Sequence, residues 1–287
     1  MGVYAVTGSA SGMGRAVMQK LRGSGHTVIG VDRHQADVVA DLSTPQGRAQ
    51  ASAAVLDVAH ERLDGAVLAA GLGPTGGPGY PQLILQVNYF GVVELLRAWR
   101  PALAATGSGR VVVFSSNSTT TVPAVPGRLV TALLGEDVRR AAKACNRLGR
   151  GNAPVLAYAG SKIAVTRWVR RHAVTAGWAG AGIRLNAIAP GAIDTPLLRQ
   201  GIQSPEQGSR IEAFPVPIGG FGDPSDLADW VVFMLGPAAA FLVGSVVFVD
   251  GGTDAYFRAD DWPCPVPLTR LARYLRRMRR FRPFPSG

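Results

Sequence analysis

The chain has 287 residues, of which 47% are hydrophobic and 17% charged, and a mean hydropathy of +0.15. This composition is too apolar and too weakly charged for a disordered chain, and the length suits one large domain or two small ones. Cys145 and Cys264 lie far apart without a C-x-x-C spacing or a histidine cluster, so the sequence supports neither a disulfide framework nor a metal site. The formal net charge of +11 is unevenly spread and does not define one basic surface.

Two stretches bear on targeting. Residues 2–6 are apolar, but no basic segment precedes them, and Val6 stands where an N-myristoylation motif needs Ser or Thr. Residues 230–249 carry no charge, but Gly236-Pro237 interrupts them, which favours a helix, a loop and a buried strand over a membrane span. We therefore expect a cytoplasmic protein.

Short β-rich apolar runs alternate with longer helix-like stretches along the chain. This rhythm is typical of a parallel sheet covered by helices on both faces, with about seven strands here. The predicted strands are Val3–Val6, Val28–Val31, Val38–Val39, Val67–Ala70, Val111–Phe114, Arg184–Ile188 and Val246–Val249. Glycine or polar residues follow nearly every strand, at the edge where doubly wound sheets bind ligands.

A glycine-rich turn follows the first predicted strand. It includes Gly8, Gly12 and Gly14, and it precedes a helix whose apolar face includes Val17 and Leu21. Glycines let the backbone approach a phosphate closely, and the helix N-terminus offers free N–H groups to a pyrophosphate. The spacing departs from G-x-G-x-x-G, so a tight connection without a ligand is the alternative.

Asp32 ends the second predicted strand. An acidic side chain at that place accepts hydrogen bonds from the adenosine ribose and repels a 2′-phosphate, which favours NAD over NADP. Arg33 beside it weakens this preference, because a guanidinium can pair with such a phosphate. Taken alone, Asp32 could also be an ordinary turn residue.

Tyr158 and Lys162 are four residues apart in a helical pattern and therefore share one helix face. A phenol with its ordinary pKa near 10 is a poor acid/base group at neutral pH, and a nearby cation lowers that pKa. The Y-x-x-x-K spacing alone is common, and the alternative is a solvated pair on a helix surface.

Further motifs accompany this pair in a set order along the chain. They are Thr7-Gly8-x-x-x-Gly12-x-Gly14, Asp32, Ala70-Gly71, Asn88, Ser115-Ser116, Tyr158-x-x-x-Lys162, Asn186-x-x-x-Pro190-Gly191 and Asp250-Gly251-Gly252. The series resembles the short-chain dehydrogenase/reductase family over residues 1 to about 257. The resemblance implies an α/β fold with a Rossmann-type doubly wound parallel sheet, and one catalytic domain at 1–257. The family's usual N-N-A-G is Leu68-Ala69-Ala70-Gly71 here, a departure that bears on bracing of the sheet.

The resemblance also implies site residues and a cofactor, NAD, with NADP less favoured. Tyr158 would exchange a proton with the substrate oxygen, Lys162 would lower the phenol's pKa and hold the nicotinamide ribose, and Ser116, or alternatively Ser115, would hydrogen-bond the substrate oxygen. Asn88 matches an asparagine that supports a water relay, and a locally packed helix Asn is the alternative. Residues expected to bind the cofactor are Gly8, Ser11, Gly12, Met13, Gly14, Asp32, Asp41, Leu42, Ala70, Gly71, Tyr158, Lys162, Pro190, Gly191, Ile193 and Thr195.

Ser116 and Tyr158 are 42 positions apart, which is longer than in most members of the family. The extra segment, about 119–151 and termed the insertion here, has a helix-like part that contains Leu129, Leu133 and Val138. Because it lies between two candidate catalytic residues, we expect it to wall the substrate pocket, and an oligomerisation element is the alternative. The resemblance implies a homo-oligomer, a dimer or tetramer, that pairs through a surface other than the helix face the insertion covers.

Four short strings narrow the resemblance to a subfamily. Residues 70–74, 87–91, 156–162 and 188–192 closely resemble those of bacterial 3α-hydroxysteroid dehydrogenases/carbonyl reductases. The function this implies is NAD-dependent interconversion of a secondary alcohol and a ketone on a hydrophobic small molecule. An aryl or allylic alcohol dehydrogenase of the coniferyl alcohol type and a non-catalytic dinucleotide-binding protein are the alternatives.

Residues 258–287 follow the last family motif and contain eight arginines against two aspartates. Within them Leu268, Leu271, Leu275, Met278 and Phe281 follow steps of three and four, which predicts a basic amphipathic helix. Such a helix suits peripheral contact with an anionic membrane or with a partner subunit, and a frayed tail is the alternative. No nucleic acid partner is expected, because no recognition motif accompanies the charge.

Overall fold

The computed structural model describes residues 1–77, 79–148, 152–203, 208–262, 264–282 and 284. Residues 149–151, at the end of the predicted insertion, lie outside the described residues.

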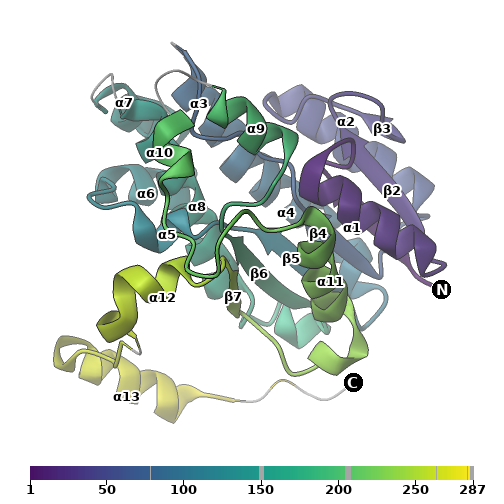
Figure 1. The fold of residues 1–287 in the computed structure, drawn as a ribbon. Coiled ribbons are helices and arrows are strands. Elements are labelled where there is room, and N and C mark those ends of the chain that lie inside the picture. The colour runs from purple at the N-terminus through teal and green to yellow at the C-terminus, as the bar shows by residue number, and fades with distance from the viewer. Residues whose placement is uncertain (78, 149–151, 204–207, 263, 283, 285–287) are drawn as a thin grey trace.

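The described residues form one sheet with helices on both of its faces (Figure 1). All strands are parallel and follow the order β3-β2-β1-β4-β5-β6-β7. The strands are β1 (Val3–Thr7), β2 (Thr27–Asp32), β3 (Val38–Val39), β4 (Gly65–Leu68), β5 (Arg110–Phe114), β6 (Arg184–Pro190) and β7 (Val246–Val249).

The α-helices are α1 (Gly12–Gly23), α2 (Pro45–Val58), α3 (Tyr80–Leu85), α4 (Gly91–Ala104), α5 (Ser118–Thr121), α6 (Gly127–Leu134), α7 (Val138–Asn146), α8 (Ala153–His172), α9 (Pro196–Ile202), α10 (Gly208–Glu212), α11 (Pro224–Leu235), α12 (Thr253–Arg258) and α13 (Leu271–Arg280). Shorter turns are the π-helical η1 (Gln86–Phe90) and the 3₁₀ turns η2 (Ala179–Ala181), η3 (Pro237–Ala239), η4 (Ala259–Asp261) and η5 (Leu268–Arg270).

The fold class and all predicted strands are confirmed, with two differences. The fourth strand was predicted two residues too late, because Ala69 and Ala70 already leave the sheet, and the Ala70 N–H donates to Thr7 Oγ1 at 3.1 Å. Strand β7 was predicted to be buried, but it lies at the edge of the sheet and is only half-buried. A β-rich apolar run does not reveal whether a second neighbour will cover its open side.

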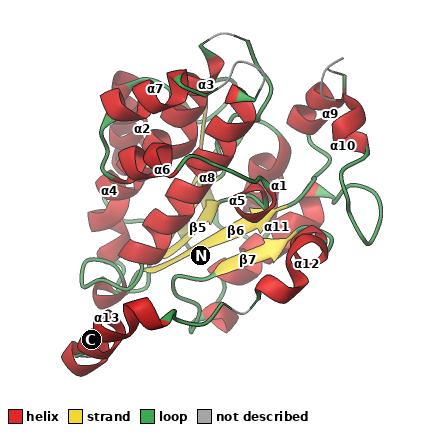
Figure 2. Ribbon diagram, turned by 90° about the vertical axis from the view of Figure 1, so that its left-hand side faces the viewer, coloured by secondary structure: helices red, strands yellow, loops and turns green. Residues whose placement is uncertain are grey.

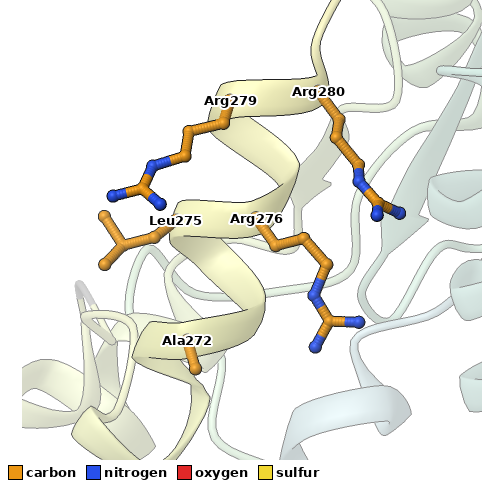
Figure 3. Close-up of a pocket in the computed structure, with 5 residues that line it drawn as sticks. All are labelled: Ala272, Leu275, Arg276, Arg279 and Arg280. Carbon is orange, nitrogen blue, oxygen red and sulfur yellow. The ribbon is translucent and has the colours of Figure 1, made fainter.

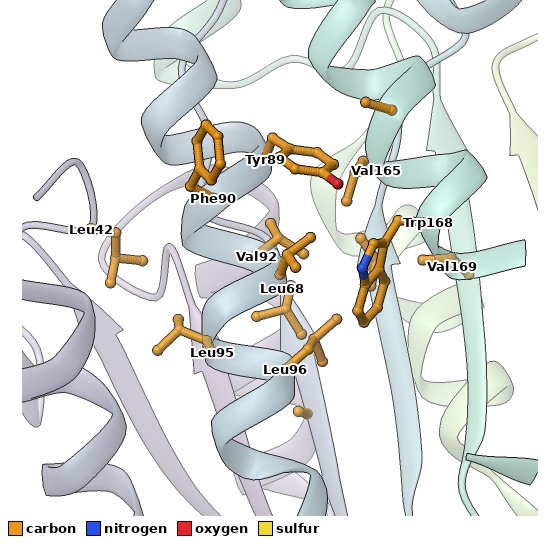
Figure 4. Packing of buried hydrophobic residues seen from close by; sticks show 14 of the residues in the cluster. Leu42, Leu68, Tyr89, Phe90, Val92, Leu95, Leu96, Val165, Trp168 and Val169 are labelled. Atoms are coloured by element: carbon orange, nitrogen blue, oxygen red, sulfur yellow. The ribbon is translucent and has the colours of Figure 1, made fainter. Parts of the chain in front are cut away.

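Apolar helix faces cover the two sides of the sheet. Helices α4 and α8 contribute to the larger core cluster, and α1 and α11 to the smaller one on the opposite face. Figure 4 shows the larger cluster, in which Leu96 of α4 lies near Trp168 of α8. Leu96 and Val169 have no exposed surface.

Three helices begin at sequence signals that the structure explains. Thr44, Thr195 and Asp223 each precede a proline, and each side chain accepts a backbone N–H of the first turn, at 3.0, 3.2 and 2.6 Å respectively. Proline suits the first helical position because the N–H it lacks would have no partner inside the helix. The cap at Thr195 fixes where α9 starts, at the edge of the cleft described below.

The helix-like part of the insertion is divided into α6 and α7. The chain reverses at Glu136, whose φ is +54°, and Asp137 then caps α7 by accepting the Arg140 N–H at 2.9 Å. Helix α6 lies on α8 where a Cβ on Gly160 would be 2.7 Å from a methyl carbon of Leu129. The absent side chain at Gly160 therefore allows the insertion to cover this part of α8.

The predicted basic helix is α13. Among the described elements, the only one that packs extensively against α13 is the adjoining turn η5. The apolar side chains of α13 are exposed, Leu271 at 45% and Met278 at 60%. Helices α6, α7 and α13 lie on one side of the molecule, at the left in Figure 1 and toward the viewer in Figure 2. No described helix is both long and apolar enough to span a bilayer.

The packing between α4 and α8 gives a prediction for stability. We expect Leu96→Ala to lower the free energy of unfolding by about 2–5 kcal/mol, because a fully buried leucine leaves a cavity. Val58→Ala, at a position 54% exposed, should change it by no more than about 0.5 kcal/mol. Urea unfolding followed by circular dichroism measures both, and equal losses would contradict the assigned core.

Candidate functional site

The strand order places a crevice at one edge of the sheet. The chain adds β2 and β3 on one side of β1 and then returns to place β4 on its other side. In such folds the connections after the two central strands diverge, which opens a crevice at their carboxyl ends. A cleft of about 610 Å³ lies there, and predicted cofactor residues line it, namely Gly8, Ser11, Gly12, Met13, Gly14, Asp32, Asp41, Leu42, Ala70, Gly71 and Thr195.

The turn after β1 requires glycine at two positions. Gly8 has φ +71°, and a Cβ there would lie 2.8 Å from the Ala70 nitrogen; a Cβ on Gly14 would lie 2.2 Å from the Gly8 oxygen. Helix α1 begins at Gly12, and its N-cap Ser11 makes no side-chain capping hydrogen bond. The first N–H groups of α1 therefore remain available to a pyrophosphate, and the cleft suits a dinucleotide.

Asp32 is held by backbone donors at the wall of this cleft. Its carboxylate accepts the N–H groups of Ala10 at 3.0 Å and of Arg33 at 2.6 Å. Arg33 and His34 line the same wall, and Arg33 Nε donates to His34 Nε2 at 3.2 Å. Asp32 and Arg33, which have opposite predicted effects on a 2′-phosphate, thus lie side by side in the wall of the cleft.

Asp41 and Leu42 form the next part of the wall. Hydrogen bonds from Ser43, first of all from its backbone N–H at 2.9 Å, lower the pKa of Asp41 below its usual value. The buried Arg48 then joins Leu42 to the helical layer, since its guanidinium donates to the Leu42 carbonyl at 3.2 Å, to Gln86 Oε1 at 3.3 Å and to Glu94 Oε2 at 2.6 Å. These bonds connect the edge of the sheet to the start of η1.

Tyr158 and Lys162 share one face of α8, as the spacing predicted. Lys162 is 5% exposed, and its Nζ donates to the Phe114 carbonyl at the end of β5 at 2.7 Å. The same nitrogen lies 5.9 Å from the centre of the Tyr158 ring. Burial lowers the pKa of Lys162 to about 8, so the ammonium form still predominates at neutral pH.

The pKa of Tyr158 is raised above its ordinary value, because burial disfavours the phenolate. A hydrogen bond with the Ser116 hydroxyl acts in the opposite direction but is the smaller effect. The expectation that Lys162 lowers this pKa is therefore not met by the protein groups alone. The phenol is protonated at neutral pH, as required of a proton donor to a carbonyl oxygen.

The structure distinguishes the two adjacent serines. Ser115 Oγ lies 2.5 Å from Thr166 Oγ1 on α8 and is engaged away from the phenol. Ser116 instead acts on the Tyr158 hydroxyl and opposes the rise of its pKa, and its Oγ accepts the Ser118 N–H at 3.1 Å. This geometry favours Ser116 over the alternative Ser115 for contact with a substrate oxygen.

Asn88 is fully buried in the π-helical turn η1. Its Oδ1 accepts the Leu72 N–H at 2.8 Å, and its Nδ2 donates to the Leu72 carbonyl at 3.0 Å. A Cβ on Gly71 would lie 3.4 Å from Asn88 Oδ1 and 3.7 Å from Lys162 Nζ. The Asn88 side chain thus braces the segment after β4 close to Lys162. These bonds agree with the alternative prediction of a locally packed asparagine.

The remaining predicted cofactor residues lie at the end of β6. Gly191 donates its N–H to the Val249 carbonyl at 3.0 Å, and a Cβ there would lie 2.7 Å from the Asp250 Cα. Ile193 is buried and pairs with Gly222. Within the described residues, these three positions, Pro190, Gly191 and Ile193, and the group around Tyr158 do not line the cleft itself.

Sequence reasoning missed several residues that line the cleft. They are His34, Ala40, Ser43, Ala69, Leu72, Leu83, Val87 and Pro196, and Leu197 and Gln200 line the cleft as well. Most of these residues lie directly beside a predicted site residue in the sequence. The signal that could have found them was therefore their position next to a motif, and not their residue type. Leu197 and Gln200 follow the Thr195 cap on α9, where helical spacing returns a side chain to the same face.

Comparison with known proteins places this site in a family. A family profile described as "Enoyl-(Acyl carrier protein) reductase" matches residues 142–254. The 3-alpha-hydroxysteroid dehydrogenase/carbonyl reductase of Comamonas testosteroni is 41% identical over 261 residues, covering 90% of this chain and 98% of the relative. A coniferyl-alcohol dehydrogenase from Pseudomonas sp. strain HR199 is 30% identical over 260 residues, 86% of this chain and 94% of that protein.

Among solved structures, the crystal structure of the 3-alpha-hydroxysteroid dehydrogenase from Pseudomonas sp. B-0831 complexed with NADH matches with a TM-score of 0.84 and 45% identity. The match covers 91% of this chain and 100% of that chain, so about a tenth of this chain lies outside it. The long similarity to such relatives and the order of the site motifs lead to one conclusion: the chain belongs to the short-chain dehydrogenase/reductase family.

Proposed function

We propose that this protein is an NAD-dependent oxidoreductase that interconverts a secondary alcohol and a ketone on a hydrophobic substrate. The observation that carries the proposal is the grouping of Ser116, Tyr158 and Lys162 at the ends of β5 and along α8, beside a glycine-lined cleft. A non-catalytic dinucleotide-binding protein would have no need to bury an ammonium group beside a phenol.

When bound, the oxidised cofactor NAD⁺ would accept a hydride from the alcohol carbon, and the reduced cofactor NADH would supply one to the carbonyl carbon. Ser116 Oγ donates a hydrogen bond to the substrate oxygen and orients it. In reduction the Tyr158 hydroxyl gives its proton to that oxygen, and in oxidation the phenolate takes the proton back. The Lys162 ammonium, held by the Phe114 carbonyl, stabilises the phenolate as it forms and lies next to Gly71 of the cleft.

The proposed substrate class is that of 3α-hydroxysteroids and similar hydrophobic carbonyl compounds. Support comes from the two 3-alpha-hydroxysteroid dehydrogenases that resemble this chain and from apolar walls at Leu72 and Leu197. An aryl or allylic alcohol is the second candidate, since a coniferyl-alcohol dehydrogenase is also a relative. Residues 1–257 would form the catalytic domain in either case.

We further propose that the protein is a homodimer that pairs along α11 and β7. Trp230 and Phe233 on α11 are 47% and 50% exposed, and β7 has an open edge. The insertion covers part of α8 through the contact of Leu129 with Gly160, which leaves less of that helix for pairing. Apolar patches of this kind are typical of protein interfaces.

The C-terminal helix α13 is proposed to make a peripheral membrane contact, in a protein located in the cytoplasm. Figure 3 shows Arg276 and Arg280 projecting to the side of α13 opposite to Leu275, while Arg279 projects on the same side as Leu275. Leu271 and Met278 lie on the apolar stripe and are exposed. Helices with one apolar and one basic face rest on anionic bilayer surfaces such as the cytoplasmic leaflet.

The proposed chemistry is tested with Tyr158→Phe. We expect kcat for a hydroxysteroid with NAD to fall by about 10²–10⁴-fold, because the group that exchanges the proton is lost. NADH binding, followed by its fluorescence, should be retained and serves as the control for folding. Unchanged turnover would contradict the mechanism, and a substrate panel with coniferyl alcohol, in which only that alcohol is oxidised, would favour the second candidate.

The cofactor preference is tested with Asp32→Ser. We expect the Kd for NADH to rise about tenfold and the Kd for NADPH to fall, because the ribose loses an acceptor and the 2′-phosphate loses a repelling charge beside Arg33. Fluorescence titration of both dinucleotides measures this. Asp57→Ser, the same change at an exposed position on α2, is the control, and an unaltered ratio of the two constants in Asp32→Ser would refute the assignment.

The membrane contact is tested with the double variant Leu271→Glu/Met278→Glu. We expect its partition onto vesicles of phosphatidylcholine and phosphatidylglycerol to fall about tenfold or more, because the apolar stripe is interrupted. Co-sedimentation of the full-length protein measures the partition. Val58→Glu/Val174→Glu makes the same change in charge at exposed positions outside α13, and equal binding of the two double variants would argue against the contact.

A further inference from the structure

A groove on the insertion has no part in the proposed chemistry. It lies between α6 and α7, has a volume of about 310 Å³, and is lined by Arg128, Ala132, Arg140, Lys143, Ala144 and Arg147. None of these residues lines the cleft between β1 and β4. We call this feature the basic groove.

The basic groove has a floor of small side chains between positively charged walls. Ala132 and Ala144 are buried at 7% and 6% exposure, and the four cationic side chains are exposed. Short floor residues allow a ligand group to approach the helix backbones, while the walls supply several donors at once. Such a groove is shaped for a group with more than one anionic oxygen.

Helical spacing explains how the sequence builds this wall. Arg140 and Lys143 of α7 and its C-cap Arg147 are three, four and seven residues apart, so they lie along one face with Ala144 between them. Arg139 also lies on α7 but is not a lining residue, because the next position along a helix points about 100° away. The charge is therefore concentrated on the groove face and not scattered around the helix.

The groove's charge is not neutralised within its own lining. No lining residue is acidic, and among the described ion pairs the groove cations make only the contact of Arg140 Nε with Asp137 Oδ2 at 3.9 Å. That pair is at the limit for a salt bridge, and an exposed pair of this kind contributes little. Four cations around one groove repel one another, and an anionic ligand removes this cost.

The position of the groove identifies the source of that anion. Helices α6 and α7 lie on the same side of the molecule as α13, at the left in Figure 1 and facing the viewer in Figure 2. A flat surface along that side would lie against the helices that carry the basic groove and against the helix that carries the exposed apolar stripe. A bilayer offers such a surface, whereas a small dissolved phosphate would engage the groove alone.

We propose that the basic groove binds the phosphate headgroup of an anionic phospholipid, as a second contact that fixes how the protein lies on a membrane. This inference rests on the membrane contact proposed for α13. Basic pockets near a membrane surface bind anionic headgroups, and two linked contacts bind more tightly than either alone. The insertion would then combine two roles, since one side of it covers α8 and the other faces the lipid.

Single substitutions in the full-length protein test the groove. We expect Arg140→Glu and Lys143→Glu each to weaken binding to phosphatidylcholine vesicles containing phosphatidylglycerol by about tenfold, because an attraction becomes a repulsion. Arg139→Glu makes the same change in charge on the same helix but outside the groove and should weaken binding by no more than about twofold. Co-sedimentation measures the partition, and turnover of a water-soluble ketone with NADH should stay unchanged in all three.

The outcomes separate this inference from the one it rests on. Equal losses of vesicle binding in Arg139→Glu and Arg140→Glu would contradict the headgroup site in the basic groove. The loss would then come from the net charge of the protein and not from the groove. If the α13 double variant loses binding while both groove variants keep it, the tail contact stands and the groove fails. If the groove variants lose binding and the α13 variant keeps it, the groove stands and the tail proposal fails.

Two further measurements test the identity of the ligand. Inorganic pyrophosphate, at the same phosphate concentration as the vesicles, should not displace the protein from them, and displacement would assign the groove to a soluble phosphate. Arg140→Glu should leave the oligomeric mass in light scattering unchanged. A changed mass without vesicles would instead assign the groove to contact between copies of the chain.

Discussion

One hydrogen bond organises the candidate site: the Lys162 ammonium donates to the Phe114 carbonyl where β5 ends. This bond joins the helical layer to the sheet at the point where the strand stops pairing, and it holds a cation in a place from which burial tends to remove it. With Lys162 fixed, the phenol one helical turn away faces Ser116, and Ser115 is left to bond Thr166. The arrangement suits the proton donor proposed here, which is protonated at rest and lies beside a cation that can stabilise its anion.

The cleft depends in turn on close approach between backbones. Gly8 leaves room for the segment after β4, Asn88 binds both backbone polar groups of Leu72, and Gly71 lies close to both Asn88 and Lys162. The chain lacks the asparagines that commonly precede this segment in its family, and the Thr7 hydroxyl accepts the Ala70 N–H instead. Strand β1, which ends at Thr7, thus supplies part of the bracing that this departure from the family pattern put in question.

The sequence predicted the strands because apolar β-rich runs between turn residues are a local signal. It placed the end of β4 two residues late, since only the hydrogen bond to Thr7 shows where the chain leaves the sheet. The motifs identified the cleft, but two adjacent serines could not be told apart by residue type. Which of Ser115 and Ser116 points toward Tyr158 depends on how α8 packs against the end of β5.

The raised pKa of Tyr158 also escaped prediction, because the extent of burial is a property of the whole fold. The basic groove escaped for the same reason: its walls come from two helices whose separation at Glu136 was not foreseen.

The buried Arg48 has a consequence for how the cleft is kept in shape. Its planar guanidinium reaches Leu42, Gln86 and Glu94 in different directions, which a lysine with one compact ammonium would not match. The cleft wall at Leu42 and the π-helical turn that carries Asn88 are therefore rigidly connected from the sheet edge to the helix layer. Part of the entropy cost of ordering the cleft is met during folding, so a dinucleotide arriving later encounters a preorganised surface.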